Sequence, residues 1–473
     1  MSVRMLRMPL AIGLGCLVGL TAGCGSPEGP NVILITLDTT RYDHLSCYDY
    51  ERKTSPNIDA LAAESAVFEH AYAVSSWTLP THASIFTGRY PKSHGARYDP
   101  GGSVKVAPAV HQGDGVASPD KEVSVRMLAP TTGTLALHLK RRGYQNFGAV
   151  AGPWMKGIFG LNLGFDQYDE SDIHALYGRA GESVSEAALG FLENKKPGPF
   201  LLFLNYYDAH QPWGAPGDAR FHFVDKKAVD SIEKMSDTAI DTLVKDIRRS
   251  ADHELLVGLY DGEIRYMDAQ VGRVFDDLKR RGLWEESWVI VTADHGEMLG
   301  EKGVYNHGVD SLSEGEIHIP LIIKPPKSGS KTGISVGRRA DFVQQVDLLP
   351  LLLSELGIDI PRDVHGVLPG RRKKPIVAEL RPSNATQGLL QAIVHDKDKL
   401  LWRERGVELY DIVLDPSELV NLQDQRPEDA ELLARRLKKI LADYPEPLAS
   451  ELGPDVDEET LEALRGLGYV GDD

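Results

Sequence analysis

Three short runs of aliphatic and β-branched residues constrain the fold of this chain more than any other feature. Their sequences are NVILITLD, PFLLFLNYYD and SWVIVTAD, and they end at Asp38, Asp208 and Asp294. Continuous apolar runs of this length are typical of strands that are buried on both faces of a sheet. Helical patterns lie between them, for example at residues 131–144 and 262–283. This alternation predicts an α/β fold with a mostly parallel sheet covered by helices.

Each of the three runs ends in a carboxylate. The carboxyl ends of parallel strands meet at one edge of a sheet, where ligands bind. A single Asp after a strand is usually a turn former or a helix cap, but three of them, two with a histidine within two residues (His210 and His295), predict one shared polar crevice. Carboxylates with an imidazole are typical ligands of Mn or Zn, and of Ca or Mg where carboxylates dominate. We therefore predict a divalent metal site at Asp38, Asp294 and His295.

The segment SSWTLPTHASIFTGRYP, residues 75–91, has the pattern of a catalytic turn. Pro80 fits the first position of a helix that starts at Thr78 or Leu79 and ends at Gly88. Thr78 could be only a cap. A hydroxyl at a helix N-terminus is nevertheless well placed, because unpaired N–H groups and the helix dipole stabilise an anion there. Beside a metal ion such a hydroxyl can act as a nucleophile, since coordination lowers its pKa.

Histidines and basic residues supply further candidates. In NYYDAHQPW, His210 could protonate a leaving oxygen or bind substrate, and Asp208 could ligate the metal or orient His210. The alternative is a surface turn closed by Pro212. A second His-Gly pair, at His307, lies downstream of His295. The side chains that could supply positive charge for an oxyanion are His82, His94, Arg41, Arg89 and Lys302, although any one of them is more often a solvated side chain than a ligand.

The N-terminal residues have the pattern of an export signal. Residues 1–24 contain two arginines and an apolar run that is too short to span a bilayer comfortably, as in a secretory signal peptide. Small residues directly before Cys24 resemble a lipoprotein processing site, which predicts a lipid at Cys24 and a location in the cell envelope. Unlipidated export, periplasmic or secreted, and a retained membrane anchor are the alternatives. Residues 25–30 form a tether rich in Gly, Pro and Ser.

Composition argues against two classes of protein. The cysteines are Cys16, Cys24 and Cys47, so no internal disulfide framework forms if the first belongs to the signal and the second carries lipid. The 52 basic and 69 acidic residues give a formal net charge of −17. Such a surface repels nucleic-acid phosphate, and we expect no nucleic-acid partner. The sequence specifies no oligomeric state.

Segment composition predicts the domain organisation. Residues 99–130 are rich in Gly, Pro and Ser and predict a long surface excursion over the crevice, and residues 326–340 predict another loop. Residues 342–358 predict an apolar helix. We expect a catalytic domain at 31–369 and a smaller C-terminal subdomain at 370–473.

Several motifs are similar, in the same order, to those of sulfatases in the alkaline phosphatase superfamily. They include NVILITLDTTRYDHLSCYDY, TLPTHASIFTGRYP, VIVTADHGEMLGEKG and ELYDIVLDPSELVNL, and the likeness covers nearly the whole chain after the tether. The resemblance implies an alkaline-phosphatase-like α/β/α sandwich with a large mixed, mostly parallel sheet and a smaller C-terminal α+β subdomain. It also implies a divalent metal ion, which is calcium in sulfatases.

The functional positions of the family match individual residues of this sequence. Asp38, Asp294 and His295 match metal positions, Thr78 matches the nucleophile and His210 matches a substrate histidine. The departures are that Thr39 follows Asp38 where sulfatases have a second Asp, that His82 replaces the signature Arg, and that Lys302 or His307 stands in for a lysine after the Asp-His-Gly loop.

Thr78 is the departure with the largest chemical consequence. Sulfatases oxidise Cys or Ser to formylglycine, whose hydrate attacks the ester and then expels sulfate as it collapses to the aldehyde. Threonine carries a methyl group on its β-carbon and cannot become that aldehyde. Phosphorus tolerates a double displacement through the hydroxyl, and the arrangement resembles that of nucleotide pyrophosphatase-phosphodiesterases and phosphoethanolamine transferases.

The sequence and the resemblance together predict an exported, metal-dependent hydrolase. It would cleave a sulfate ester, or a related phosphate or phosphonate ester, by attack of a metal-bound hydroxyl. Thr78, His210 and His307 are the predicted catalytic residues, and His82 and Lys302 are predicted to bind the anionic ester. Two alternatives stay open: a phosphodiesterase or phospho-headgroup transferase that uses Thr78, and a catalytically inactive binding protein with the sulfatase fold.

Overall fold

The structure is a computed structural model, and it describes residues 29–99, 104–106, 123–174, 178–229, 253–308, 310–381 and 388–447. The predicted signal peptide, most of the tether and the predicted lipid site at Cys24 lie outside these residues. Within the described part of the chain, no helix combines the length and the apolar composition needed to cross a membrane.

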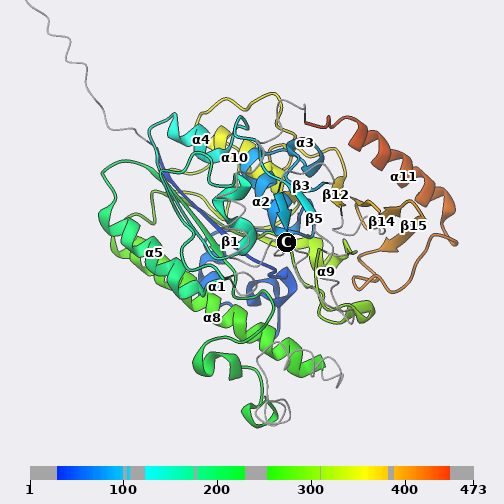
Figure 1. Cartoon of the computed structure of the whole chain (residues 1–473), viewed down its shortest axis with the longest axis horizontal. Coiled ribbons are helices and arrows are strands. Elements are labelled where there is room, and N and C mark those ends of the chain that lie inside the picture. The colour runs from blue at the N-terminus through cyan, green and yellow to red at the C-terminus, as the bar shows by residue number, and fades with distance from the viewer. Residues whose placement is uncertain are drawn as a thin grey trace, which may run out of the picture.

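An eight-stranded sheet forms the centre of the molecule (Figure 1). Its order is β11-β2-β10-β9-β1-β8-β6-β7, and in this sheet only β10 runs antiparallel to its neighbours. The strands are β1 Asn31–Leu37, β2 Ala66–Tyr72, β6 Gln145–Val150, β7 Gln167–Asp169, β8 Phe200–Tyr206, β9 Ser287–Ala293, β10 His318–Lys324 and β11 Gly337–Gln344. The three apolar runs are β1, β8 and β9, which lie side by side and parallel at the centre, as predicted.

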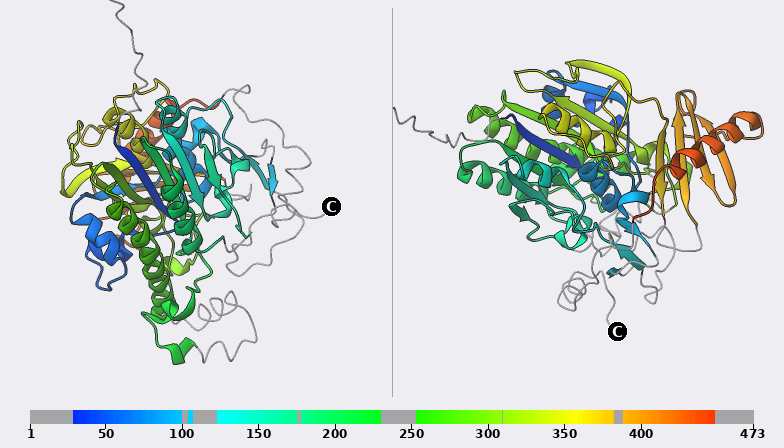
Figure 2. Two further views of the ribbon diagram at one scale, coloured as in Figure 1. Left: turned by 90° about the vertical axis from the view of Figure 1, so that its left-hand side faces the viewer. Right: turned by 90° about the horizontal axis from the view of Figure 1, so that it is seen from above.

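Helices cover both faces of this sheet, because successive side chains of a strand point to opposite faces. Ile33 and Ile35 of β1 pack with one helix layer, and Val32 and Leu34 pack with the other. The first layer contains α1 Pro56–Ala62, α5 Gly181–Asn194 and α8 His253–Arg280, and the second contains α2 Thr78–Thr87, α4 Leu135–Lys140 and α10 Leu348–Glu355. Figure 2 shows the two layers on either side of the sheet. The predicted α/β/α sandwich with a mixed, mostly parallel sheet is confirmed.

A smaller antiparallel sheet with a helix against it follows the main sheet (Figures 1 and 2). Its strands are β12 Ile376–Leu380, β13 Leu390–His395, β14 Asp398–Arg403 and β15 Gly406–Asp411, and the helix is α11 Pro427–Ala442. Leu433 and Leu437 of α11 share a core with Ile393 and Leu400 of the sheet. The predicted small C-terminal α+β unit is therefore present, whereas its boundary at residue 370 stays a prediction.

Two of the predicted loops contain strands. The three strands β3 Arg97–Tyr98, β4 Val104–Val106 and β5 Val123–Arg126 form a small antiparallel sheet. The predicted surface excursion at 99–130 therefore includes β4 and β5, its position over the crevice stays a prediction, and residues 100–103 and 107–122 lie outside the described part. The predicted loop at 326–340 is wrong from Gly337 onward, where β11 begins.

The apolar helix predicted at 342–358 is shorter in the structure. Residues 342–344 are the end of β11, a 3₁₀ turn follows at Gln345–Asp347, and α10 begins only at Leu348. Phe342 pairs with His70 of β2, so pairing at the sheet edge overrides the local helical pattern.

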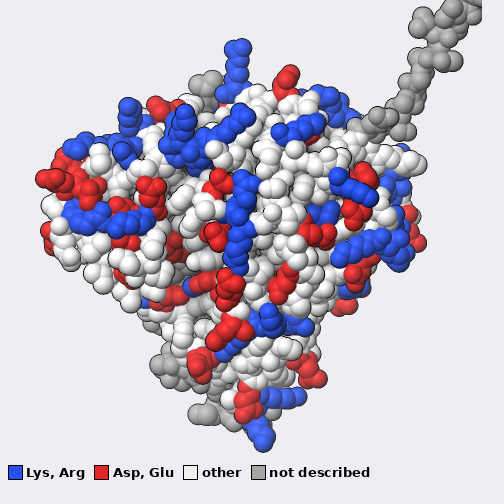
Figure 3. All heavy atoms as spheres, turned by 180° about the vertical axis from the view of Figure 1, so that it is seen from behind, with Lys and Arg blue, Asp and Glu red and all other residues white. Residues whose placement is uncertain are grey.

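Short helices complete the described part of the chain. They are α3 Pro91–His94 and α9 Glu314–Ile317, with 3₁₀ turns at Tyr42–His44, Ser46–Tyr48, Pro153–Met155, Gly157–Phe159, Gly217–Phe221, Glu301–Gly303 and Gln345–Asp347. Figure 3 shows acidic and basic side chains interspersed over one face of the molecule.

Candidate functional site

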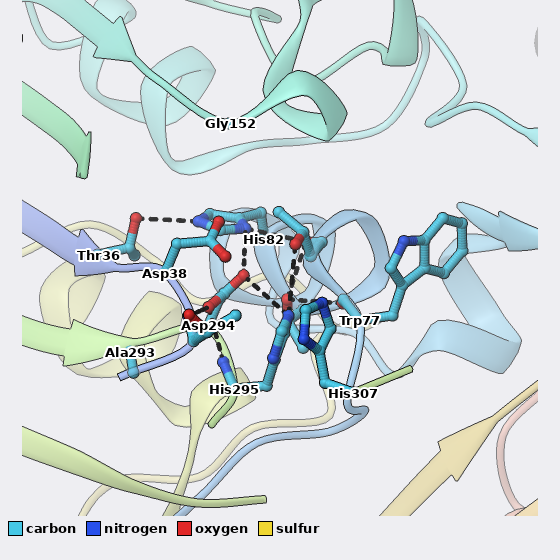
Figure 4. A network of polar contacts seen from close by, with 12 residues as sticks. Thr36, Asp38, Trp77, His82, Gly152, Ala293, Asp294, His295 and His307 are labelled. Atoms are coloured by element: carbon cyan, nitrogen blue, oxygen red, sulfur yellow. Dashed lines mark hydrogen bonds and ion pairs between the residues drawn. The ribbon is translucent and has the colours of Figure 1, made fainter. Parts of the chain in front are cut away.

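Two adjacent strands bring the predicted metal ligands together. Leu37 of β1 is in register with Ala293 of β9, so Asp38 and Asp294 leave the sheet side by side. One ligand atom from each of Asp38, Asp294 and His295 lies within 4.8 Å of the others, and all three residues are buried. Figure 4 shows these side chains converging at the end of the two strands.

The carboxylates in this cluster are only partly satisfied by the protein. Oδ1 of Asp294 accepts hydrogen bonds from the N–H groups of Thr39 (3.1 Å) and His295 (2.8 Å). Among the described residues, Oδ2 of Asp294 and both carboxylate oxygens of Asp38 accept no hydrogen bond, although all three are buried. Burial, followed by the charge of Asp294, raises the pKa of the Asp38 carboxyl well above its usual value. The polar side chain of Asn205 lowers this pKa in part. Buried oxygens of this kind fit a divalent cation.

His295 presents the nitrogen that a metal requires. Its Nδ1 lies 2.9 Å from the carbonyl oxygen of Gly296, so Nδ1 carries the proton and donates it. In the neutral imidazole the lone pair is then on Nε2, which lies 3.4 Å from Oδ2 of Asp294. Imidazole is a typical ligand of Zn, and carboxylates are typical ligands of Mg, Ca and Mn, so this donor set fits a divalent cation.

Thr78 is the first residue of α2, and its hydroxyl faces this cluster. Oγ1 of Thr78 lies 3.4 Å from Nε2 of His295, and the residue is 3% exposed. The residue in the N-cap position is Trp77, so Thr78 is not the cap. The helix ends at Gly88 in a left-handed conformation, as predicted, but Pro80 is the third helical residue and not the first. That position still belongs to the first turn, where the N–H group that proline lacks would have no partner within the helix.

His82 lies one turn further along α2 and is fully buried. Its Nδ1 is 2.9 Å from the carbonyl oxygen of Thr78, and its Nε2 is 2.9 Å from Oγ1 of Thr36 in β1 (Figure 4). Burial lowers the pKa of the imidazole, so His82 is neutral. It joins the first turn of α2 to the central strand, and its predicted contact with substrate stays a prediction.

His210 and His307 lie next to each other at the same edge of the sheet. Their ring centroids are 4.9 Å apart, and the ring of His307 is 4.5 Å from that of His295. Nδ1 of His307 lies 3.1 Å from Oε2 of the buried Glu297, and Nδ1 of His210 lies 2.6 Å from the carbonyl oxygen of Gln211. Both Nδ1 atoms therefore act as donors, which fixes the orientation of the rings.

Other predicted candidates face protein partners. Nζ of Lys302 lies 3.5 Å from Oε2 of Glu418 and 4.5 Å from the centre of the Tyr410 ring, both from the C-terminal part of the chain. The role of Lys302 in substrate binding stays a prediction. Among the weaker candidates, Arg41 pairs with Asp43 and Glu301, Arg89 with Asp363, and His94 with Ser84.

Asp208, the third strand-end carboxylate, is not part of the metal cluster. Its Oδ1 accepts a hydrogen bond of 2.8 Å from the N–H of Gly181, the first residue of α5. Burial raises the pKa of this carboxyl to about 6. The candidate metal cluster therefore contains two of the three carboxylates, and Oδ1 of Asp208 satisfies an N–H at the start of α5.

Sequence reasoning missed two residues that shape the cluster. Asn205 of β8 accepts a hydrogen bond from the N–H of Gly152 (2.9 Å) and donates one to Oγ1 of Thr36 (3.3 Å). A Cβ atom at Gly152 would lie 3.3 Å from Oδ2 of Asp38, so the lack of a side chain lets the backbone of residue 152 lie close to the Asp38 carboxylate. The available signal was Asn205 itself, a polar residue inside the apolar run PFLLFLNYYD.

Known proteins resemble this chain in sequence and in fold. The sulfatase family model matches residues 30–358. The chain is 27% identical to an arylsulfatase of Clostridium perfringens, over 83% of this chain and 90% of that protein. A solved complex with the substrate D-glucosamine-2-N,6-O-disulfate has a TM-score of 0.66 at 19% identity, covering 88% of this chain and 98% of the other. The phosphonate monoester hydrolase of Agrobacterium radiobacter has a TM-score of 0.61 at 20% identity, covering 88% and 96%.

The two solved structures share the fold of this chain, and the family model covers most of its sequence. The main sheet, the smaller antiparallel sheet and the order of the motifs agree with that match. The chain therefore belongs to the sulfatase family of hydrolases in the alkaline phosphatase superfamily.

Proposed function

We propose that this protein is a metal-dependent hydrolase of an anionic ester in which the hydroxyl of Thr78 is the nucleophile. The observation that carries the proposal is the position of Oγ1 of Thr78, 3.4 Å from Nε2 of His295 at the start of α2. Asp38, Asp294 and His295 would hold the divalent cation. When bound, the cation would lower the pKa of the nucleophile and offset the charge of the ester.

The side chain of Thr78 limits how the reaction can end. Attack of Oγ1 on sulfur or phosphorus forms a covalent ester and releases an alcohol. Because the β-carbon of threonine carries a methyl group, this ester cannot collapse to an aldehyde. Water must attack the sulfur or phosphorus and displace Oγ1, which regains a proton. Phosphorus tolerates two successive displacements well, so we expect phosphate or phosphonate esters to react faster than sulfate esters.

His210 and His307 are the groups that we expect to assist the leaving alcohol. The departing oxygen needs a proton, and an imidazole is the usual side chain that provides one near neutral pH. Glu297 holds Nδ1 of His307 at 3.1 Å, so Nε2 of His307 is the nitrogen that would deliver the proton. His210, whose ring lies 4.9 Å from that of His307, would bind the ester beside it.

Two substitutions at Thr78 test the nucleophile. Thr78→Val keeps the branched shape and removes the hydroxyl, whereas Thr78→Ser keeps the hydroxyl. We expect Val to lower kcat/KM by about 10³-fold or more and Ser to retain most of it, with equal metal content in both. Aryl sulfate, phosphate monoester, phosphate diester and phosphonate monoester substrates should be compared, and mass spectrometry should find the covalent adduct on Thr78. Full activity of the Val variant would refute the proposal.

The same assays separate the two alternatives. A transferase would pass the group from Thr78 to an added alcohol in preference to water. A binding protein would take up metal but turn over no ester of any class, and Thr78→Val would then match the wild type.

We also infer that the chain is exported and carries a lipid at Cys24. The charged start, the short apolar run and the small residues before Cys24 support this. Cell fractionation tests it: the wild type should partition with membranes, and Cys24→Ser should move to the soluble fraction. Equal partitioning of both would contradict the lipid.

A further inference from the structure

The turn that follows β1 has an unusual backbone conformation. Thr39 has a φ of 51°, which is strained for a β-branched residue. In this conformation its N–H donates a hydrogen bond of 3.1 Å to Oδ1 of Asp294. The strained turn therefore connects the end of β1, which carries Asp38, to the second carboxylate of the cluster.

A tyrosine from α8 holds both sides of this turn. Tyr260 is fully buried, and its hydroxyl donates to the carbonyl oxygen of Thr39 (2.8 Å) and accepts from the N–H of Arg41 (2.9 Å). Two main-chain groups that flank the turn are thus bound by one side-chain oxygen. Because Thr39 and Arg41 are buried as well, bulk water has no easy access to replace these bonds.

The same turn also binds the loop that follows His295. Nη1 of Arg41 donates to the carbonyl oxygen of Glu297 (3.2 Å) and to Oε1 of Glu301 (2.6 Å). A shift of the turn would therefore disturb both halves of the cluster, through Asp294 Oδ1 and through this loop.

We propose that Tyr260 is a positioning residue for the metal site. Its hydroxyl keeps the turn of Thr39 and Arg41 in the strained conformation, which fixes Oδ1 of Asp294, while Oδ2 of Asp294 accepts no hydrogen bond from the described residues. This inference rests on the proposed metal site. It assigns a role to a residue of α8, a helix that contributes none of the candidate metal ligands. Partners of metal ligands commonly affect metal affinity about 10- to 100-fold.

Tyr260→Phe tests the inference, because it removes the hydroxyl and keeps the packed ring. Tyr48→Phe is the matched control. The hydroxyl of Tyr48 also accepts from a main-chain N–H, that of Leu321 (2.9 Å), and contacts the carbonyl oxygen of Phe68 (3.1 Å), but it joins β2 to β10. The dissociation constant for Mn²⁺ and the Tm of the metal-free protein should be measured for both variants and the wild type.

We expect both variants to lower the Tm and only Tyr260→Phe to weaken Mn²⁺ binding, by about tenfold or more. If Tyr260→Phe binds Mn²⁺ as tightly as the wild type, or if Tyr48→Phe weakens binding equally, the inference is wrong while the proposed function stands. If the wild-type chain binds none of Mn²⁺, Zn²⁺, Ca²⁺ and Mg²⁺, the proposed metal-dependent function fails and the inference fails with it.

Discussion

At the scale of single residues, Asp38 shows how a buried charge can serve binding at the expense of stability. Its two carboxylate oxygens are buried without hydrogen bonds from the described residues and lie close to Asp294. Burial and the neighbouring charge raise its pKa, which means that the ionised form is disfavoured in the metal-free protein. A cation would reverse this balance, since it compensates both carboxylates.

Asp38→Asn should therefore stabilise the metal-free protein and abolish its stabilisation by metal. We expect the metal-free variant to melt at a higher Tm than the metal-free wild type, because the repulsion with Asp294 is removed. We also expect the rise in Tm on adding Mn²⁺ to disappear. Asp218→Asn is the control, because the side chain of Asp218 is 96% exposed. A variant that melts lower without metal, or that keeps the rise with Mn²⁺, would contradict this account of the site.

At the scale of elements, Asp208 illustrates how one chemical group serves different purposes at different strand ends. Its carboxylate accepts the N–H of Gly181 and so satisfies a donor at the start of α5, where the helix dipole favours negative charge. Asp38 and Asp294 directly follow β1 and β9 and lie in the candidate metal cluster, whereas Asp208 is the second residue after β8. This offset of one residue and the start of α5 separate the role of Asp208 from that of the other two carboxylates.

Asp208→Ala should lower stability and leave metal binding intact. Loss of a capping carboxylate typically costs about 0.5–2 kcal/mol of unfolding free energy. Asp208→Asn, which keeps an acceptor for Gly181, should cost less. Urea unfolding and Mn²⁺ titration of the two variants measure both effects. A loss of Mn²⁺ affinity in Asp208→Ala would instead restore the predicted role of Asp208 in the metal site.

At the scale of the whole molecule, a buried lysine connects the two sheets. Nζ of Lys399, in β14, lies 3.0 Å from Oε1 of Glu314 in α9 and 2.7 Å from Oε1 of Glu418, and its side chain is fully buried. Removing one partner of such a group leaves uncompensated buried charge, which typically costs about 3–5 kcal/mol. Lys399 is therefore a fully buried cation at the interface between the two parts of the molecule.

Lys399→Met should lower the unfolding free energy by about 3–5 kcal/mol, measured by urea unfolding at neutral pH. Lys397→Met removes a lysine that pairs with Asp411 but is half exposed, and we expect a change of about 1 kcal/mol or less. Equal losses in the two variants would contradict a special role for the buried lysine.

The same ion pair predicts a pH dependence. Burial alone would raise the pKa of Glu314, but Lys399 and His318 outweigh it and lower the pKa to about 2. The unfolded chain has the ordinary value near 4.5. Stability from this group is therefore fully present above about pH 4.5 and is lost as the pH falls toward 2. Between pH 5 and pH 3 the wild type should lose more unfolding free energy than Lys399→Met, and parallel losses would contradict the assignment.

Local pattern was sufficient for the centre of the fold. The three apolar runs are buried on both faces, so their composition alone predicts them as the central strands β1, β8 and β9. The outer strands were harder to predict, because β7 and β11 are partly exposed and depend on their neighbours for pairing. Phe342 shows this, since its pairing with β2 keeps it in a strand although its sequence context favours a helix.

The sequence by itself predicted the fold class, a candidate metal triad and a helix that starts at Thr78 or Leu79, because strand ends and helix starts follow from local residue types. Only the tertiary structure decided which carboxylates meet. The register between β1 and β9 places Asp38 beside Asp294, whereas the carboxylate of Asp208 accepts a hydrogen bond from the start of α5. It also made His82 a neutral link to Thr36 and placed Tyr260 against the turn at Thr39. These contacts join residues far apart in the chain, and no local pattern encodes them.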